Sequence, residues 1–369
     1  MKEGWEYKKL GEVCDILNGF AFKSEKYVNE GIRVLRISNV QKGIIVDNDP
    51  KYYPYNEKNN ISPYILNKND LLMSLTGNVG RVGLLNEKLL PAALNQRVAC
   101  LRVKNQTILI LFLFHLLNSD KFENDCILNA SGVAQKNMST EWLKKYIIPI
   151  PSIKEQQQIV SELDLLSGVI EKQKAQLEEL DKLAQSIFYD MFGDPCNNHK
   201  NFEVKPIEKV CILKAGKAIK AEELLNYSEN LYPCYGGNGI RGYINRFSHD
   251  GTFPIIGRQG ALCGNVNLAN GQFYATEHAV VVTPIIDLNA IWLYYVLLNM
   301  RLGQYAHGVA QPGLSVKDIS PLLMILPPLS LQQEFAAKVE AIEAMKVKVR
   351  QSLKEAETLF NERMNYYFN

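Results

Sequence analysis

Few residues of the kinds that bind metals or form disulfide bonds occur in this sequence of 369 residues. It contains seven cysteines and five histidines. The number of cysteines is odd, no two of them form a CxxC pair, and no cysteine–histidine cluster has the spacing of a zinc site. We therefore expect no bound metal, and the reduced thiols of a cytoplasmic protein.

Long apolar runs are also missing. The first ten residues contain no apolar stretch of the kind found in a signal peptide, which again favours a cytoplasmic location. The most apolar run is Ile108–Leu117, which is too short to cross a bilayer and contains His115. We expect this run to form a buried helix or strand, with His115 as a hydrogen-bonded core residue.

Neither sign of charge is in large excess. Lys and Arg number 41 against 39 Asp and Glu, so the net charge is +2, which excludes a polycation and an acidic tail protein. The charge is uneven along the chain, at +5 for residues 1–150, −4 for 151–192, +1 for 193–326 and 0 for 327–369. The positive charge therefore lies mainly in the first segment.

Motifs for catalysis are absent. There is no GxxxxGK[ST] phosphate-binding loop and no [DNS]-P-P-[YFW] adenine-methyltransferase signature. A GxGxxG occurs at Gly237, Gly239 and Gly242, but the residues that follow resemble a strand or turn and not the helix that a dinucleotide site requires. No nucleophile, base and orienting group come together in the sequence. We therefore expect a recognition protein with no catalytic residues.

An internal repeat is the most informative feature. WEYKKLGEVCDILNGFAFK from Trp5 matches FEVKPIEKVCILKAGKAIK from Phe202, at an offset of 197. TGNVGRVG from Thr76 matches IGRQGALCG from Ile256 at 180 to 181, and SGVAQKNMS from Ser131 matches HGVAQPGLS from His307 at 176. The last match continues without a gap, as IPSIKEQQQ in the first copy and LPPLSLQQE in the second. The chain is therefore a tandem duplication whose second copy has shorter loops.

Each copy consists of a globular α+β part followed by a long helix. The predicted segments are 1–150 and 194–326 for the globular parts, and 151–193 and 327–369 for the helices. Ser152 and Ser330 are candidate helix caps. Apolar residues spaced alternately by four and three predict a coiled-coil seam, interrupted by Gln173, Lys346 and Arg363. The predicted seam residues are Ile159, Leu163, Leu166, Ile170, Leu177, Leu180, Ile187, Phe335, Val339, Ile342, Val349, Leu353 and Phe360.

Connectivity orients the two helices. If their seams bury each other, the helices run antiparallel between the two globular parts, which a pseudo-twofold axis then relates. A helix of about 38 residues is ~57 Å long, the length of ~17 base pairs. Two interpretations stay open at this point: a spacer of set length, or a bundle that only braces two domains.

Polar side chains suited to duplex DNA gather on turn-rich segments of both globular parts. Phosphates attract cations, and base edges are read by Arg, Lys, Asn and Gln. The candidate DNA-binding residues are Asn78, Arg81, Gln96, Arg97, Gln135, Lys136, Arg241, Arg246, Arg258, Gln259 and Gln311. Both copies keep Gln135/Gln311 and Gly132/Gly308. The repeated residues indicate either DNA contact or a structural turn capped by the glutamine.

The whole chain resembles the specificity subunit of type I restriction–modification systems (the HsdS family). The two openings from Trp5 and Phe202, the GVAQ motifs, and the PIPSIKEQQQIV and PPLSLQQEFAAKV segments that begin the helices carry the resemblance. It implies two target recognition domains, each reading one half of a bipartite DNA site, and helices that set the gap and dock two modification subunits. These partners would use S-adenosylmethionine to methylate adenine, and a restriction subunit with ATP and Mg²⁺ would join them.

Under the same resemblance this chain holds no cofactor and no catalytic residue. The runner-up hypothesis is a bivalent coiled-coil scaffold whose end domains bind proteins, and a third is a stand-alone methyltransferase. Salt-dependent binding to duplex DNA separates the first two, and direct binding of S-adenosylmethionine would favour the third.

Overall fold

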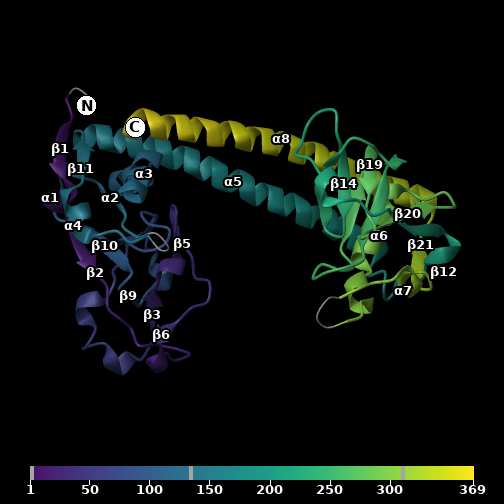
Figure 1. Ribbon diagram of the computed structural model, residues 1–369, viewed down its shortest axis with the longest axis horizontal. Helices are drawn as coiled ribbons and strands as arrows, with labels where there is room; N and C mark the ends of the chain where they lie inside the picture. Colours follow the sequence, from purple (N-terminus) through teal and green to yellow (C-terminus); the bar gives the residue numbers. More distant parts are fainter. Residues whose placement is uncertain (1–3, 133–135, 309–311) are drawn as a thin grey trace. The chain divides into compact units, whose positions relative to one another are not determined.

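The computed structural model describes residues 4–132, 136–308 and 312–369. The chain divides into two compact units, residues 1–173 with 352–369 (unit 1) and residues 174–351 (unit 2). Both units combine small sheets with helices (Figure 1). The predicted α+β class and tandem duplication are confirmed, because the elements of unit 2 follow the order of those in unit 1.

Unit 1 is built from short strands, short helices and parts of two long helices. Its elements are β1 Glu6–Lys9, α1 Leu10–Val13, β2 Cys14–Asn18, β3 Ile32–Leu35, β4 Val40–Gln41, β5 Ile44–Ile45, β6 Tyr52–Tyr53, β7 Leu71–Ser74, β8 Val82–Leu84, β9 Ala92–Leu94, β10 Val98–Val103, α2 Ile110–Leu117, α3 Asp120–Asn129, α4 Thr140–Lys145 and β11 Ile147–Ile150. To these it adds the start of α5 (Ile153–Phe192) and the end of α8 (Leu329–Phe368).

Unit 2 repeats this plan with the end of α5 and the start of α8. Its other elements are β12 Glu203–Pro206, β13 Cys211–Ala215, β14 Tyr232–Gly236, β15 Gly239–Ile244, β16 His249–Asp250, β17 Phe253–Gly257, β18 Val266–Ala269, β19 Gln272–Ala275, β20 Ala279–Pro284, α6 Ala290–Asn299, α7 Val316–Ile319 and β21 Leu323–Leu326.

Two sheets have the same topology in both units. The first and last strands pair antiparallel, as β1–β11 with Lys8 opposite Ile148, and as β12–β21 with Lys205 opposite Met324. A four-stranded sheet follows in the order β2-β10-β7-β8 in unit 1 and β13-β20-β17-β18 in unit 2. Each unit also has a third sheet with a parallel pair, β3–β9 or β14–β19.

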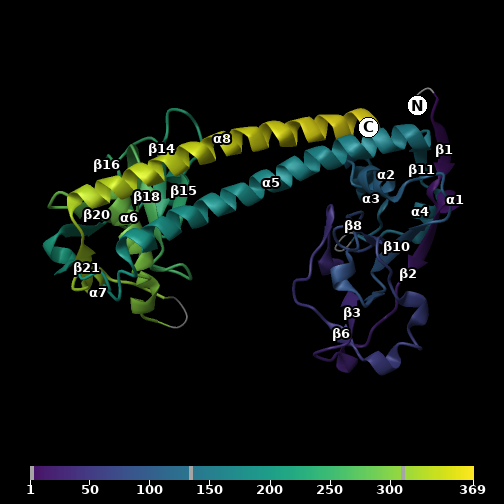
Figure 2. The same ribbon diagram turned by 180° about the vertical axis from the view of Figure 1, so that it is seen from behind.

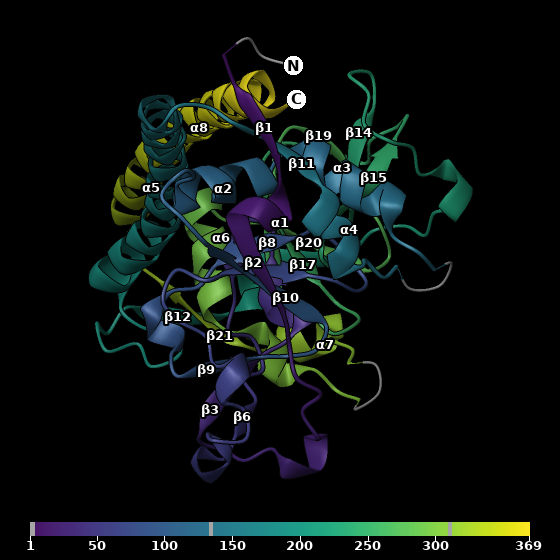
Figure 3. The ribbon, with the colours of Figure 1, turned by 90° about the vertical axis from the view of Figure 1, so that its left-hand side faces the viewer.

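Each unit has its own main core between the four-stranded sheet and the helices. In unit 1, α2 contributes Phe112, Leu113 and Leu117, all fully buried, and the predicted helix or strand over the apolar run is therefore a helix. In unit 2, α6 contributes Trp292 and Leu293 to the equivalent core. Within unit 1, α2 lies between the sheet and α5, whereas β3 and β6 lie at the edge of the unit remote from α5 (Figures 2 and 3).

The long helices each contain 40 residues and no internal proline. Ser152 caps α5 in a capping box, in which the Glu155 amide donates to Ser152 Oγ and the Ser152 amide donates to Glu155 Oε2. The expectation for Ser330 is wrong. Helix α8 begins at Leu329, so Ser330 lies inside it, and the amides of Leu331 and Gln332 donate to the Pro328 carbonyl instead.

In each unit the two long helices run antiparallel and in contact. In unit 1, Arg363 donates to Glu162 at 2.9 Å, and Gln173 donates to Ser352 Oγ at 2.6 Å. In unit 2, Leu180, Ala184 and Ile342 form a small buried cluster. All the predicted seam residues are buried or half-buried, and the first two, Ile159 and Leu163, belong to the main core of unit 1 together with Met364 and Phe368.

A buried glutamine attaches each long helix to its globular part. Gln156 accepts from the Leu109 amide and donates to the carbonyls of Thr107 and Pro151. Gln332, its repeat equivalent, accepts from the Asn289 amide and donates to the Pro327 carbonyl. These contacts explain why the glutamine-rich segment occurs in both copies, a role that its sequence did not reveal.

Candidate nucleic-acid interface

Three segments of unit 1 that the sequence singled out lie next to one another. Main-chain hydrogen bonds connect them: the Leu75 amide donates to the Arg97 carbonyl at 3.0 Å, and the Gly77 amide donates to the Lys136 carbonyl at 2.9 Å. The Met138 amide donates back to the Leu75 carbonyl. We name residues 75–81, 95–97 and 131–137 the unit 1 loop cluster, of which residues 133–135 lie outside the described part of the chain.

Unit 2 contains the same arrangement. The Arg258 amide donates to the His278 carbonyl at 3.0 Å, and the Gly260 amide donates to the Pro312 carbonyl at 3.0 Å. The Leu314 amide donates back to the Arg258 carbonyl. We name residues 258–265, 276–278 and 307–313 the unit 2 loop cluster, of which residues 309–311 are not described.

The hydrogen bonds correct the alignment of the glycine-rich loops. The sequence match pairs Gly77 with Gly257 and Gly80 with Gly260. By backbone partners, Gly77 is equivalent to Gly260, and Gly80 to Gly264, because the Gly80 and Gly264 amides donate to the equivalent carbonyls of Ser74 and Gly257. All four of these loop glycines have positive φ, between 73° and 93°. The offset is therefore 183 to 184, and the unit 2 loop is one residue longer.

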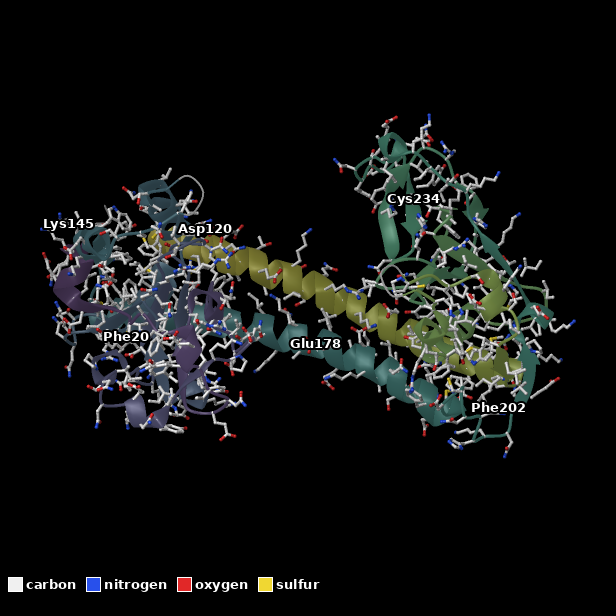
Figure 4. All side chains as sticks on the ribbon, turned by 60° about the horizontal axis from the view of Figure 1, so that its bottom comes forward. Phe20, Asp120, Lys145, Glu178, Phe202 and Cys234 are labelled. Carbon is white, nitrogen blue, oxygen red and sulfur yellow. The ribbon has the colours of Figure 1, made fainter. Side chains whose placement is uncertain are left out.

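A glycine near the start of each repeat supports the turn before β10 or β20. Gly19 lies against the carbonyl of Asn95, and Gly216 lies against that of Ala275, so neither position has room for a Cβ atom. The next residue, Phe20 (Figure 4), donates its amide to Leu94 and accepts from Gln96. Both turns also have a side-chain acceptor at the same place: Asn95 for the Arg97 amide, and Thr276 for the His278 amide.

Several side chains of the unit 1 loop cluster are polar and accessible. Asn78, Gln96 and Arg97 are exposed, and Lys136 is half-buried. The Arg81 guanidinium donates to Gln41, and with its amide oxygen turned toward Arg81, Asn78 accepts from both terminal nitrogens at 3.3 and 3.2 Å. This part of unit 1 therefore presents cations and amides together.

In unit 2 the GxGxxG segment forms the β14–β15 hairpin, whose first strand includes Cys234 (Figure 4). No helix follows it, so the segment lacks the form of a dinucleotide-binding loop. The hairpin turn lies on the unit 2 loop cluster, because Gly257 is in close contact with the Gly237 carbonyl and Asn265 donates to Asn238 at 3.1 Å. Arg241, on β15, packs over Gly236 at the end of β14.

The structure separates Arg246 from this group. In the hairpin, Gly236 pairs with Gly239 next to the turn, and Tyr232 pairs with Ile244 at the open end. Arg246 follows Ile244 and therefore lies beyond the open end, away from the turn. Its guanidinium pairs with Glu223 at 2.7 Å and lies over the Tyr274 ring, and the Glu223 hydrogen bond raises the pKa of Arg246. Gln135 and Gln311 lie outside the described residues, so their role stays a prediction. The glycines beside them, Gly132 and Gly308, have φ of 106° and 96°.

Two features of unit 2 escaped the sequence analysis. The turn Thr276–His278 is the equivalent of Asn95–Arg97, but no side chain is common to the two turns. Asn238 and Asn265 meet only because the hairpin folds over the loop. Neither relationship leaves a signal in the sequence.

The repeat-related cysteines Cys14 and Cys211 are buried. Burial raises the pKa of the Cys14 and Cys211 thiols to about 12, which leaves them protonated and unreactive. Among residues 4–132, 136–308 and 312–369, no three His, Cys, Asp or Glu side chains form a group suited to a metal ion. In the same ranges, no helix is long and apolar enough to cross a membrane.

Comparison with known proteins agrees with this picture. The family model described as the type I restriction modification DNA specificity domain matches the chain twice, over residues 2–182 and 199–357. The EcoprrI specificity subunit of Escherichia coli is 32% identical over 361 residues, which cover 92% of this chain and 88% of that protein. The EcoBI specificity subunit of Escherichia coli is 24% identical over 392 residues, which cover 92% of this chain and 79% of that protein.

Solved structures share the fold. The type I S subunit from M. genitalium has a TM-score of 0.62 at 16% identity, over 99% of this chain and 96% of that one. A second structure, described as the basis of complex assembly and conformational transition of the type I R-M system, has a TM-score of 0.59 at 18% identity, over 100% and 98%.

The chain belongs to the family of type I restriction–modification DNA specificity domains. It is the DNA-recognition component of such a system and not a catalytic one. The alternative of a coiled-coil scaffold without DNA specificity finds no support in these comparisons.

Proposed function

We propose that the chain reads a bipartite DNA target, with one half-site for each unit and a non-specific gap set by the long helices. The observation that carries this proposal is the duplication of the loop cluster. Each unit joins the same three segments by the same main-chain hydrogen bonds, while the side chains differ between the units. Two equal scaffolds with different polar side chains are suited to two different half-sites.

We further propose that the long helices dock two methyltransferase subunits, one for each repeat. Four pairs of exposed apolar side chains, three on the helices and one on the preceding strands β11 and β21, support this, because each pair is related by the repeat of 176 residues. The pairs are Ile147/Leu323 (60% and 60% exposed), Ile153/Leu329 (37% and 37%), Val169/Met345 (36% and 45%) and Leu183/Leu359 (45% and 45%). Exposed apolar groups at repeated positions suit a protein partner that binds twice.

The charge of α5 fits docking better than DNA contact. Residues 151–192 carry a net charge of −4, and Glu171, Glu178 (Figure 4) and Glu179 are exposed on the helix. Carboxylates there repel phosphates, whereas the +5 of residues 1–150 attracts them. In this proposal the partner subunits carry S-adenosylmethionine and methylate adenine, a restriction subunit uses ATP and Mg²⁺, and the complex acts in the cytoplasm. This chain would hold no cofactor.

Mapping of methylated adenines in the source genome, with and without this gene, tests the proposal. We expect a motif of two short defined segments separated by a gap of fixed length, which disappears when the gene is deleted. A single ungapped motif that depends on the gene would contradict the bipartite model. An unchanged methylation pattern would contradict the role in methylation altogether.

A further inference from the structure

The arginines of the chain fall into two groups. Seven of the eleven form an ion pair with a carboxylate: Arg33, Arg36, Arg102, Arg246, Arg301, Arg350 and Arg363. Within the described ranges, Arg81, Arg97, Arg241 and Arg258 have no carboxylate partner. Two of these four lie in each unit, and all four are in or beside a loop cluster. An arginine is always charged, so these positions hold uncompensated cations.

Three of the four, Arg97, Arg241 and Arg258, also lack a side-chain hydrogen bond to any described residue. Arg81 donates to Gln41, and Arg241 packs over Gly236. In the part of the chain that the structure describes, the guanidinium groups of Arg97 and Arg258 have neither an ion pair nor a hydrogen-bond partner. Arg97 is exposed and Arg258 is half-buried.

Arg97 and Arg258 belong to the same hydrogen-bonded main-chain pair in the two units, although they are not equivalent residues and do not align in sequence. In unit 1 the Leu75 amide bonds to the Arg97 carbonyl, and in unit 2 the Arg258 amide bonds to the His278 carbonyl. Leu75 is equivalent to Arg258, and Arg97 to His278. The arginine supplies the carbonyl of this pair in unit 1 and the amide in unit 2. The two positions of such a pair are about one strand spacing (~4.8 Å) apart.

Each of these arginines has an exposed glutamine next to it in the chain. The pairs are Gln96–Arg97 in unit 1 and Arg258–Gln259 in unit 2, in reversed order. Arginine recognises guanine through O6 and N7, and glutamine recognises adenine through N6 and N7. A phosphate contact requires only the positive charge, so the adjacent amide favours a base-reading role.

We propose that Gln96–Arg97 and Arg258–Gln259 are the base-reading pairs of the two units, each directed at a guanine beside an adenine in one half-site. This inference rests on the proposed reading of one half-site by each unit and adds the residues that perform it. The main-chain hydrogen bonds of each loop cluster hold the backbone of its pair in place, so the loops need not fold on contact with DNA. The reversed order of the two residues predicts that each unit orders guanine and adenine differently relative to its own backbone.

The test uses the full-length chain assembled with its methyltransferase subunits and selection of bound duplexes from a randomised pool. We expect Arg258→Ala to lower discrimination for one guanine by about 5- to 150-fold, in one half-site only. Arg97→Ala should do the same in the other half-site, and Gln259→Ala should relax an adenine beside the first guanine. Arg258→Lys should fail to restore specificity, because lysine keeps the charge but not the bidentate geometry.

Lys205→Ala is the matched control, since it removes one positive charge from unit 2 at the β12 edge, where Lys205 pairs with Glu203. It should leave both half-sites unchanged. A uniform loss of affinity for all sequences, restored by Arg258→Lys, would make Arg258 a phosphate contact and overturn the inference. Relaxation of the same half-site by Arg97→Ala and Arg258→Ala would also overturn it. If the unsubstituted complex selects no gapped motif, the proposed function itself fails.

Discussion

Lys346 on α8 is buried against Asp181 on α5, with its ammonium nitrogen 2.5 Å from the carboxylate. Glu343 binds the same nitrogen at 2.5 Å. Burial disfavours the charged form of Lys346, but the hydrogen bonds to Asp181 and Glu343 outweigh it and raise the pKa of Lys346. The equivalent residue in the first repeat is Ile170, so the polar contact is confined to one copy.

Removal of the Lys346 side chain should destabilise the fold less than removal of its two carboxylate partners. We expect Lys346→Ile to leave the free energy of unfolding unchanged or raised by about 1–3 kcal/mol, because the seam becomes apolar and both carboxylates already reach solvent. Replacement of both Asp181 and Glu343 by Ala should lower it by about 1–3 kcal/mol, because a buried ammonium then lacks partners. Urea unfolding measures both. Greater destabilisation by Lys346→Ile than by the double variant would contradict this account.

The stability of unit 1 should fall in mild acid because of His115. Burial lowers the pKa of His115, although Asp164 at 2.7 Å partly opposes this shift. A lowered pKa means that the folded state binds fewer protons than the unfolded state. Stability is therefore lost as the pH falls below the ordinary value of 6.5, by up to about 1.4 kcal/mol per pH unit.

The measurement is urea unfolding between pH 5 and 8. His115→Gln should flatten the dependence on pH in this range, whereas His199→Gln, at an exposed position, should leave it unchanged. A slope that persists in the His115→Gln variant would assign the effect to other groups.

Gly216 should matter for only one half-site. A methyl group there meets the Ala275 carbonyl, so Gly216→Ala must displace the turn that precedes β20 and carries His278. We expect discrimination to fall at the half-site read by unit 2 and to persist at the other. Gly168→Ala, where nothing lies within 4 Å of the added methyl on α5, is the control and should stabilise the helix by about 0.5–1 kcal/mol. Equal loss at both half-sites would point to general unfolding.

The stoichiometry of the methyltransferase subunit should respond to Met345. An aspartate at this exposed apolar position should reduce the number of bound subunits from two to one, measured by native mass spectrometry. Val347 is more exposed, at 60%, but its repeat equivalent is Glu171, so Val347→Asp should leave two subunits bound. The two residues lie on different sides of α8. Equal effects of both substitutions would remove the argument from repeated positions.

The length of the helices should set the gap in the target. Gln173 and Ser352 are hydrogen-bonded to each other, so seven residues inserted after Gln173 and seven before Ser352 lengthen α5 and α8 at the same level. A heptad adds about 10.5 Å, so we expect the methylated motif to gain about 3 base pairs of gap. A gap of unchanged length would favour helices that only brace the two units.

The sequence was most informative where a pattern repeats. The spacing of Ile159, Leu163 and Leu180 predicts the long helices because core-facing positions recur every three or four residues. The sequence did not show that Arg97 and Arg258 belong to the same main-chain pair, because this depends on which carbonyl accepts from which amide across two separate segments. The loop after Gly257 has one extra residue, so the sequence alignment pairs the wrong glycines of the two copies. No side chain in the loop indicates where the extra residue lies. The assignment of DNA-binding residues stays a prediction.

Main-chain hydrogen bonds connect the three segments of each loop cluster. Because an amide and a carbonyl are present whatever the side chain, Leu75 and Arg258 make the same two hydrogen bonds in the two units. Side chains at these positions are therefore free to change without loss of the connections that position them. If the loop clusters read DNA as proposed, single substitutions there should change the half-site of one unit at little cost in stability and leave the half-site of the other unit unchanged.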